Sequence, residues 1–120
     1  MNAKVERFED LQVWKESMQL AVRVYEEMTS ARDFGLKDQM QRAAVSIPAN
    51  IAEGYERGSN REFVQFLHYS QGPGGELRTQ IYLAGKLGFL DQTVSREWLE
   101  KSRKVSAMLH KYIRVRKQDF

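Results

Sequence analysis

A row of polar side chains recurs every three or four residues between positions 39 and 57, the spacing that brings side chains together on one face of a helix. Its guanidinium, hydroxyl, amide and carboxylate groups can form ion pairs and hydrogen bonds. They either fix the register of neighbouring helices or subunits, or they bind a ligand or nucleic acid. The row consists of Gln39, Arg42, Ser46, Asn50, Glu53 and Arg57.

A second candidate site is basic and lies near the end of the chain. Between residues 101 and 117, no acidic residue interrupts a series of lysines and arginines. On a helix whose core face carries Trp98, Val105 and Leu109, four of these cations fall on the opposite side. They are candidates for contacts with the phosphates of RNA or DNA; the alternative is a solvated face. The four residues are Arg103, Lys104, Lys111 and Arg114.

The other reactive side chains form no recognisable catalytic, cofactor or metal site. The glycine-rich segment 72–75 lacks the Lys-Ser or Lys-Thr that follows it in a P-loop. Glu53, Glu62 and Glu76 lack the Glu-x-x-His pairs of metal sites in helical bundles. There is no cysteine, and the two histidines are His68 and His110. We therefore expect a protein that is not an enzyme and holds neither metal nor cofactor.

The composition predicts one domain covering residues 1–120. A chain of this length buries enough surface to fold without cross-links, and the absence of cysteine fits a reducing compartment. No apolar run approaches the ~20 residues of a membrane span, and no secretory signal is recognisable. The formal net charge of +3 does not by itself indicate nucleic-acid binding. We expect a cytoplasmic protein without membrane contact.

Apolar periodicity predicts four helices, at about residues 9–30, 36–57, 60–87 and 93–116, and hence an all-α fold. In the second helix Gly54 and Gly58 have separate expected roles: one admits a neighbouring helix, and the other ends the helix in the left-handed conformation. The apolar stripe of this helix consists of Leu36, Met40, Ala43, Ile47 and Ile51.

Pro48 lies inside the second helical pattern. It removes one backbone hydrogen bond and crowds the carbonyl of Ala44, so a bend is expected there. We expect Ser46 or Asn50 to satisfy the carbonyl that the proline leaves unpaired.

The first helix carries more apolar surface than one neighbouring pair of helices requires. Two apolar sets lie side by side on it, and one alternates over seven residues, which predicts a bundle seam. The other set, Val13, Leu20 and Val24, belongs either to a broad core face or to a subunit interface. The predicted seam consists of Leu11, Trp14, Met18, Ala21, Tyr25 and Met28.

The third helix contains Gly72-Pro73-Gly74-Gly75, a segment that helix propensity alone predicts to break it. We expect one kinked helix, with two shorter helices as the alternative. Glu76 and Gln80 lie one turn apart on its polar side. We expect them to meet Arg42 or Arg57 across the bundle.

Two segments and several single residues carry a family resemblance: RAAVSIPANIAEG at 42–54, LQVW at 11–14, Arg57, Phe63, Phe66, Leu67, Gly72 and Glu76-Leu77. They resemble the bacterial four-helix-bundle proteins encoded by intervening sequences within 23S ribosomal RNA genes, an S23 ribosomal-protein-like family. The likeness spans nearly the whole chain, although Pro73 and the glycines after it depart from the family pattern.

The resemblance implies an antiparallel up-down-up-down four-helix bundle that assembles into a ring-like homo-oligomer, a pentamer. It also implies a bacterial protein whose basic surface binds RNA. The family signature includes a polar row that serves the subunit interface or the helix register. In this chain the row consists of Arg42, Ser46, Asn50, Glu53, Arg57 and Glu76.

Two functional hypotheses follow from these features. In the first, a non-enzymatic homo-oligomer binds the backbone of RNA or DNA through the four cations of the last helix. Because no motif for reading bases is present, such binding is expected to be weakly sequence-specific and strongly salt-dependent. In the alternative, the assembly is a protein-interaction or scaffolding ring without a nucleic-acid role, and the polar row sets subunit register or docks a partner protein.

Overall fold

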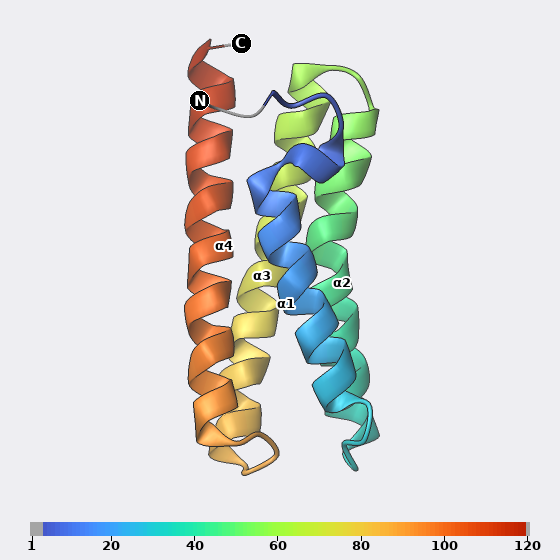
Figure 1. The fold of residues 1–120 in the computed structure, drawn as a ribbon, viewed down its shortest axis with the longest axis vertical. Helices are drawn as coiled ribbons and strands as arrows, with labels where there is room; N and C mark the ends of the chain where they lie inside the picture. The colour runs from blue at the N-terminus through green and yellow to red at the C-terminus, as the bar shows by residue number, and fades with distance from the viewer. Residues whose placement is uncertain (1–3, 120) are drawn as a thin grey trace.

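Antiparallel helices make up the computed structural model, which describes residues 4–119 (Figure 1). No strand occurs in this range, so the predicted all-α fold is confirmed. The last helix continues to Asp119 rather than ending near residue 116. The elements are the 3-10 helix η1 (Phe8–Asp10) and the α-helices α1 (Gln12–Met28), α2 (Phe34–Glu56), α3 (Asn60–Lys86) and α4 (Gln92–Asp119).

The helices form an up-down-up-down bundle. Figure 1 shows the chain descending in α1, rising in α2, descending in α3 and rising in α4. Each helix packs against its neighbours in the chain, and α1 and α4 close the bundle. The contact between α2 and α3 is the most extensive, whereas α1 and α4 share the smallest helix-to-helix contact. The bundle is therefore least tightly closed between its first and last helices.

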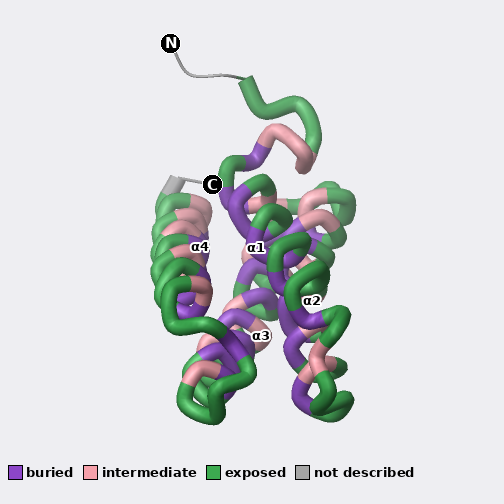
Figure 2. The backbone as a smooth tube through the Cα atoms, turned by 60° about the horizontal axis from the view of Figure 1, so that its bottom comes forward, coloured by how far each residue is buried: buried purple, intermediate pink, exposed green. Residues whose placement is uncertain are grey.

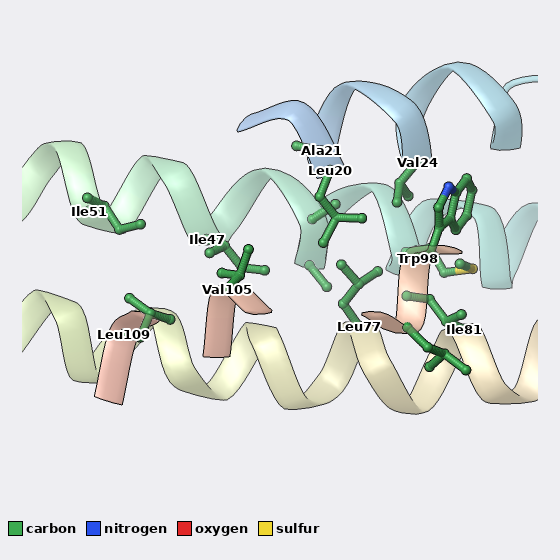
Figure 3. Packing of buried hydrophobic residues seen from close by; sticks show 14 of the residues in the cluster. Leu20, Ala21, Val24, Ile47, Ile51, Leu77, Ile81, Trp98, Val105 and Leu109 are labelled. Atoms are coloured by element: carbon green, nitrogen blue, oxygen red, sulfur yellow. The ribbon is translucent and has the colours of Figure 1, made fainter. Parts of the chain in front are cut away.

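All four helices contain buried residues, which are purple in Figure 2. Their apolar side chains form one core cluster. Leu20 of α1, Ile47 of α2, Leu77 of α3 and Val105 of α4 lie close to the bundle axis (Figure 3). Burying a side chain of this size contributes about 1.5–3 kcal/mol. The predicted core stripe of α2 is confirmed, and on α4 the buried residues are Trp98, Leu99, Ser102, Val105, Leu109 and Ile113, with Ser95 near the start of the helix.

The predicted seam of α1 is wrong in part. Met18 and Tyr25 are 40% and 51% exposed, whereas the second apolar set, Val13, Leu20 and Val24, lies in the core. A seven-residue alternation of apolar side chains shows that a helix has an apolar stripe, but it does not show which neighbouring helices the stripe faces. Because α1 must face α2 and α4 at once, the centre of its buried face falls between these neighbours. The second set therefore belongs to the broad core face, and the surplus apolar surface lies elsewhere on α1.

The Gly72–Gly75 segment does not break α3, which is one uninterrupted helix from Asn60 to Lys86. The alternative of two shorter helices is therefore wrong. Gly74 is buried, and Leu67 and Leu77 on either side of the segment are fully buried. Tertiary packing of these flanking turns outweighs the low helix propensity of proline and glycine, as it often does in helices buried between neighbours.

α2 continues through Pro48, but the expected satisfaction of the Ala44 carbonyl by a side chain is wrong. Asn50 Nδ2 donates to the carbonyl of Ser46 (2.8 Å), and Ser46 Oγ donates to the carbonyl of Arg42 (2.9 Å). Both bonds reach back four residues along the helix, the distance at which a short polar side chain meets a carbonyl. Neither Ser46 nor Asn50 lies four residues after Ala44, so neither side chain reaches its carbonyl.

The contact between α2 and α3 depends on a glycine. A Cβ atom on Gly54 would lie 2.5 Å from the Cβ of Phe66, so only glycine permits this approach. Gly58 has a φ of +84° just after α2 and ends the helix in the left-handed conformation. Both predicted glycine roles are confirmed. At the same contact, Ser70 Oγ donates to the carbonyl of Ile47 (3.0 Å).

Candidate nucleic-acid interface

The four cations predicted to contact phosphates are all exposed on α4. They lie outward because Trp98, Val105 and Leu109 occupy the opposite side of the helix and are buried in the bundle. Their electrostatic surroundings differ, however, and this difference divides the group. The predicted residues are Arg103, Lys104, Lys111 and Arg114.

Lys104 is engaged by a buried carboxylate that the sequence reasoning missed. Glu16 of α1 is 7% exposed and forms salt bridges with Lys104 (3.0 Å) and Lys101 of α4. Hydrogen bonds from Lys101 and then Lys104 lower the pKa of Glu16 from 4.5 to about 2, against the opposing effect of burial. Lys104 therefore helps to join α1 to α4, and it shares the single negative charge of Glu16 with Lys101.

The other three cations have no acidic partner within the described part of the chain. Arg103 Nη2 donates to the hydroxyl of Tyr82 on α3 (2.6 Å), which leaves its charge uncompensated. Lys111 and Arg114 take part in no salt bridge or side-chain hydrogen bond among residues 4–119. Tyr82 is 41% exposed beside Arg103 and was not predicted as part of the site. An exposed aromatic side chain next to a guanidinium can stack on a nucleobase.

Polar contacts along the edge between α3 and α4 hold the basic face in place. Asn60 Nδ2 donates to the carbonyl of Arg116 (3.1 Å), and Arg116 Nη1 donates to Asn60 Oδ1 (3.2 Å). The Arg116 guanidinium also lies 4.9 Å from the ring centre of Phe63. Further along, Arg78 Nε donates to Ser102 Oγ (3.3 Å). These contacts fix how far α4 is rotated, and therefore which cations point outward.

The two histidines belong to the same edge. His68 Nδ1 lies 3.1 Å from Gln71 Oε1, and Gln71 Nε2 lies 3.2 Å from His110 Nδ1. The amide of Gln71 thus links one imidazole to the other across α3 and α4. Both histidines are exposed on this side of the bundle.

The side chains of the polar row of α2 form salt bridges and hydrogen bonds mainly with groups of the same helix. Arg42 pairs with Asp38 (3.2 Å), while the Ser46 and Asn50 side chains bond to backbone carbonyls of the same helix. Arg57 is the exception within the row. It pairs with Glu53 of α2 (3.1 Å) and with Glu62 of α3 (3.6 Å).

The expected pairing of Arg42 or Arg57 with Glu76 and Gln80 is wrong. Arg57 is instead directed toward the start of α3, where its guanidinium also lies 5.0 Å from the ring centre of Phe66. Glu76 is exposed and makes no side-chain interaction among residues 4–119. Gln80 is buried, and its Oε1 has no hydrogen-bond partner in the described structure. Because α2 and α3 are antiparallel, Arg57 at the end of α2 meets the first turns of α3 and not its middle.

Comparison with known proteins identifies the family. The family model described as 23S rRNA-intervening sequence protein matches residues 9–111. The chain belongs to this family. The comparison with curated proteins gives no match. A crystal structure of a protein of unknown function from the S23 ribosomal protein family of Bacteroides thetaiotaomicron VPI-5482 has the same fold, with a TM-score of 0.79 at 22% identity over 84% of this chain and 97% of that chain.

Residues 42–54, the longest segment of the family resemblance, have a structural role in the bundle of this 23S rRNA-intervening sequence protein. Within it, Ile47 and Ile51 are core residues and Gly54 lets α3 approach. The match extends through α4 as far as residue 111 and so covers two of the three uncompensated cations, Arg103 and Lys111. None of the helices in residues 4–119 combines the length and apolar character that crossing a bilayer requires.

Proposed function

We propose that this 23S rRNA-intervening sequence protein is a non-enzymatic homo-oligomer that binds the phosphate backbone of RNA or DNA through α4. The observation that carries the proposal is the set of uncompensated cations Arg103, Lys111 and Arg114 on one exposed side of the helix. Phosphates would supply the negative charge that these side chains lack within residues 4–119. The family description refers to 23S rRNA, which makes RNA the first ligand to test.

Self-association would strengthen such binding. Three cations on one chain give a weak contact, but a closed assembly, which the resemblance places at five copies in a ring, presents the same face several times. Binding at one face raises the effective concentration of phosphates at the next, so overall affinity grows faster than the number of faces. Because the contacts are made with the backbone, we propose little base specificity beyond stacking at Tyr82.

Fluorescence anisotropy with a labelled single-stranded RNA at increasing salt tests the proposal. Alanine at Arg103, Lys111 and Arg114 together should weaken binding and reduce the slope of log affinity against log salt by about 0.7 for each contact per chain. Lys104→Ala should change affinity less than alanine at any one of these three, because Glu16 already holds this lysine in a salt bridge. Lys86→Ala, at the far end of α3, is the control for net charge.

Unchanged affinity in the triple alanine variant would remove the nucleic-acid part of the proposal. So would a loss in log affinity from the triple variant no greater than three times that from Lys86→Ala, because binding would then follow net charge alone. The alternative function, a protein-interaction or scaffolding assembly, is favoured by the exposed apolar side chains of α1. A preparation that is oligomeric but has no affinity for RNA or DNA would support this alternative.

A further inference from the structure

A groove between α1 and α4 is lined by both tryptophans of the chain. It has a volume of about 730 Å³, which lies within the usual range of small-molecule sites. The groove forms where the two helices share the smallest helix-to-helix contact of the bundle. Its apolar lining combines two buried residues, Leu20 and Trp98, with Met18 and Val22, which are 40% and 44% exposed. The site therefore offers an apolar body contact that reaches from solvent to the core.

The hydrogen-bond acceptors on the two walls of this groove are already in use. Arg23 Nη2 donates to Glu97 Oε2 (2.9 Å), and Lys101 Nζ donates to Gln19 Oε1 (2.8 Å). Both bonds join α1 to α4. A ligand therefore gains little from carrying donor groups of its own.

Two donors that line the groove remain without an acceptor. Trp98 is 2% exposed, and its indole Nε1 has no hydrogen-bond partner among residues 4–119. Figure 3 shows this indole reaching from α4 toward α1. Lys15 is exposed and forms neither a salt bridge nor a side-chain hydrogen bond within the same range. Because a buried donor left unpaired costs free energy, the groove favours a ligand with an acceptor near Trp98 and an anionic group near Lys15.

The spacing of these two donors follows from the bonds between α1 and α4. By the same pairing, Trp98 comes level with Val22 on the antiparallel α1. Lys15 lies seven residues before Val22, which is about 10 Å along the helix axis at a rise of about 1.5 Å per residue. Met18 lies between these two levels. The apolar part of the lining therefore separates the cationic end of the groove from the indole N–H.

We propose that this groove binds an amphipathic carboxylic acid that carries a second hydrogen-bond acceptor about 10 Å from the carboxylate, such as a hydroxy fatty acid. The carboxylate pairs with Lys15, the apolar chain covers Met18 and Val22, and the second oxygen accepts a hydrogen bond from Trp98 Nε1. The inference goes beyond the proposed function. It needs no nucleic acid, and the groove is lined by none of the cations Arg103, Lys111 and Arg114.

Isothermal titration calorimetry with three simple probes, each below its micellar concentration, tests this assignment. ω-Hydroxydecanoate carries both groups, decanoate lacks the second acceptor, and α,ω-decanediol lacks the charge. We expect ω-hydroxydecanoate to bind roughly three- to tenfold more tightly than decanoate, the effect of one hydrogen bond, and more tightly than the diol. Binding should also change the tryptophan fluorescence, because both tryptophans line the groove.

Two variants separate the contributions of the donors. Lys15→Gln should weaken both acids by roughly two- to fivefold and leave the diol unchanged, because it removes one exposed ion pair. Trp98→Phe keeps an aromatic ring but removes the N–H, so the advantage of ω-hydroxydecanoate over decanoate should disappear. Lys86→Gln, at an exposed lysine of α3 outside the groove, is the matched control. Circular dichroism verifies the fold of each variant.

The absence of binding heat and of a fluorescence change with both acids would overturn the site. So would equal affinities of the two acids for the wild-type protein, or a loss in Lys15→Gln no larger than that in Lys86→Gln.

A second copy of the chain is the competing occupant of the groove. Met18→Glu places a negative charge in the apolar lining and should weaken binding of ω-hydroxydecanoate at least tenfold, while the mass by light scattering stays that of the wild type. A lower mass would instead assign the groove to a contact between copies and overturn the ligand site. None of these measurements includes RNA, so failure of the ligand site leaves the proposed nucleic-acid binding to its own test.

Discussion

Replacement of Glu16 by glutamine tests the electrostatic connection between α1 and α4. The carboxylate is almost fully buried and holds two lysines, Lys101 and Lys104, at the place where the bundle is least extensively packed. Glutamine keeps the size and an acceptor oxygen but removes the charge. The substitution therefore isolates the ionic part of the interaction and should leave the packing of the neighbouring core residues unchanged.

The size of the expected loss in the free energy of unfolding follows from the pKa of Glu16. A decrease from 4.5 to about 2 corresponds to roughly 3 kcal/mol of stabilisation when the group is ionised in both states. The Lys104 side chain is 58% exposed, so solvent screening reduces this figure. We expect Glu16→Gln to lower the free energy of unfolding by about 2–3 kcal/mol at pH 7.

The pH dependence has a definite sign. A carboxylate with a lowered pKa stabilises the folded state above its unfolded pKa of 4.5, and this stabilisation is lost as the pH falls toward about 2. The wild-type protein should therefore lose more than half of the Glu16 contribution between pH 7 and pH 3. The difference between wild type and Glu16→Gln should fall to about 1 kcal/mol at pH 3.

Urea unfolding followed by circular dichroism at several pH values measures this difference. Protein concentration must be equal throughout, because self-association adds to apparent stability. Glu27→Gln, an exposed carboxylate on the same helix, is the matched control and should change stability little at any pH. A Glu16→Gln penalty that is equal at pH 3 and pH 7, or equal to that of Glu27→Gln, would refute the reasoning.

Two glycine substitutions should have opposite effects on thermal unfolding. Gly75→Ala should raise stability by about 1 kcal/mol, because a Cβ there meets no atom within 4 Å and alanine is the better helix former; an unchanged or lower melting temperature would contradict this. Gly54→Ala should lower stability by about 1–3 kcal/mol, because its Cβ would overlap Phe66 and push α3 away from α2. A Gly54→Ala protein as stable as wild type would show that the helices separate without cost.

The sequence allowed the faces of α2 and α4 to be predicted but not that of α1. On α2, residues such as Met40, Ile47 and Ile51 form one apolar stripe, so periodicity alone determines the buried side. On α1 two apolar sets overlap, and the choice between them depends on where α2 and α4 lie. That choice is tertiary information, which is why Met18 was assigned to the core and proved to be exposed.

The continuity of α3 could not be predicted for a related reason. Helix propensity is a local quantity, and the Gly72–Gly75 segment scores poorly by it. The flanking residues Leu67 and Leu77 are held in place by two neighbouring helices, which local reasoning does not include. Glu16 was missed because a glutamate on a helix is usually solvated. One signal was available, since Glu16 lies between Val13 and Leu20 on the side of α1 that is buried.

The basic residues of α4 fall into two groups, one that stabilises the bundle and one that we propose binds nucleic acid. Its first part, with Lys101 and Lys104, is occupied by Glu16 and closes the weakest contact of the bundle. Its later part leaves Lys111 and Arg114 without acidic partners among the described residues. The number of cations in the sequence therefore overstates the charge available to phosphates. Because ion pairing in the first part fixes α1 against α4, the same run also positions the face that we propose for nucleic acid.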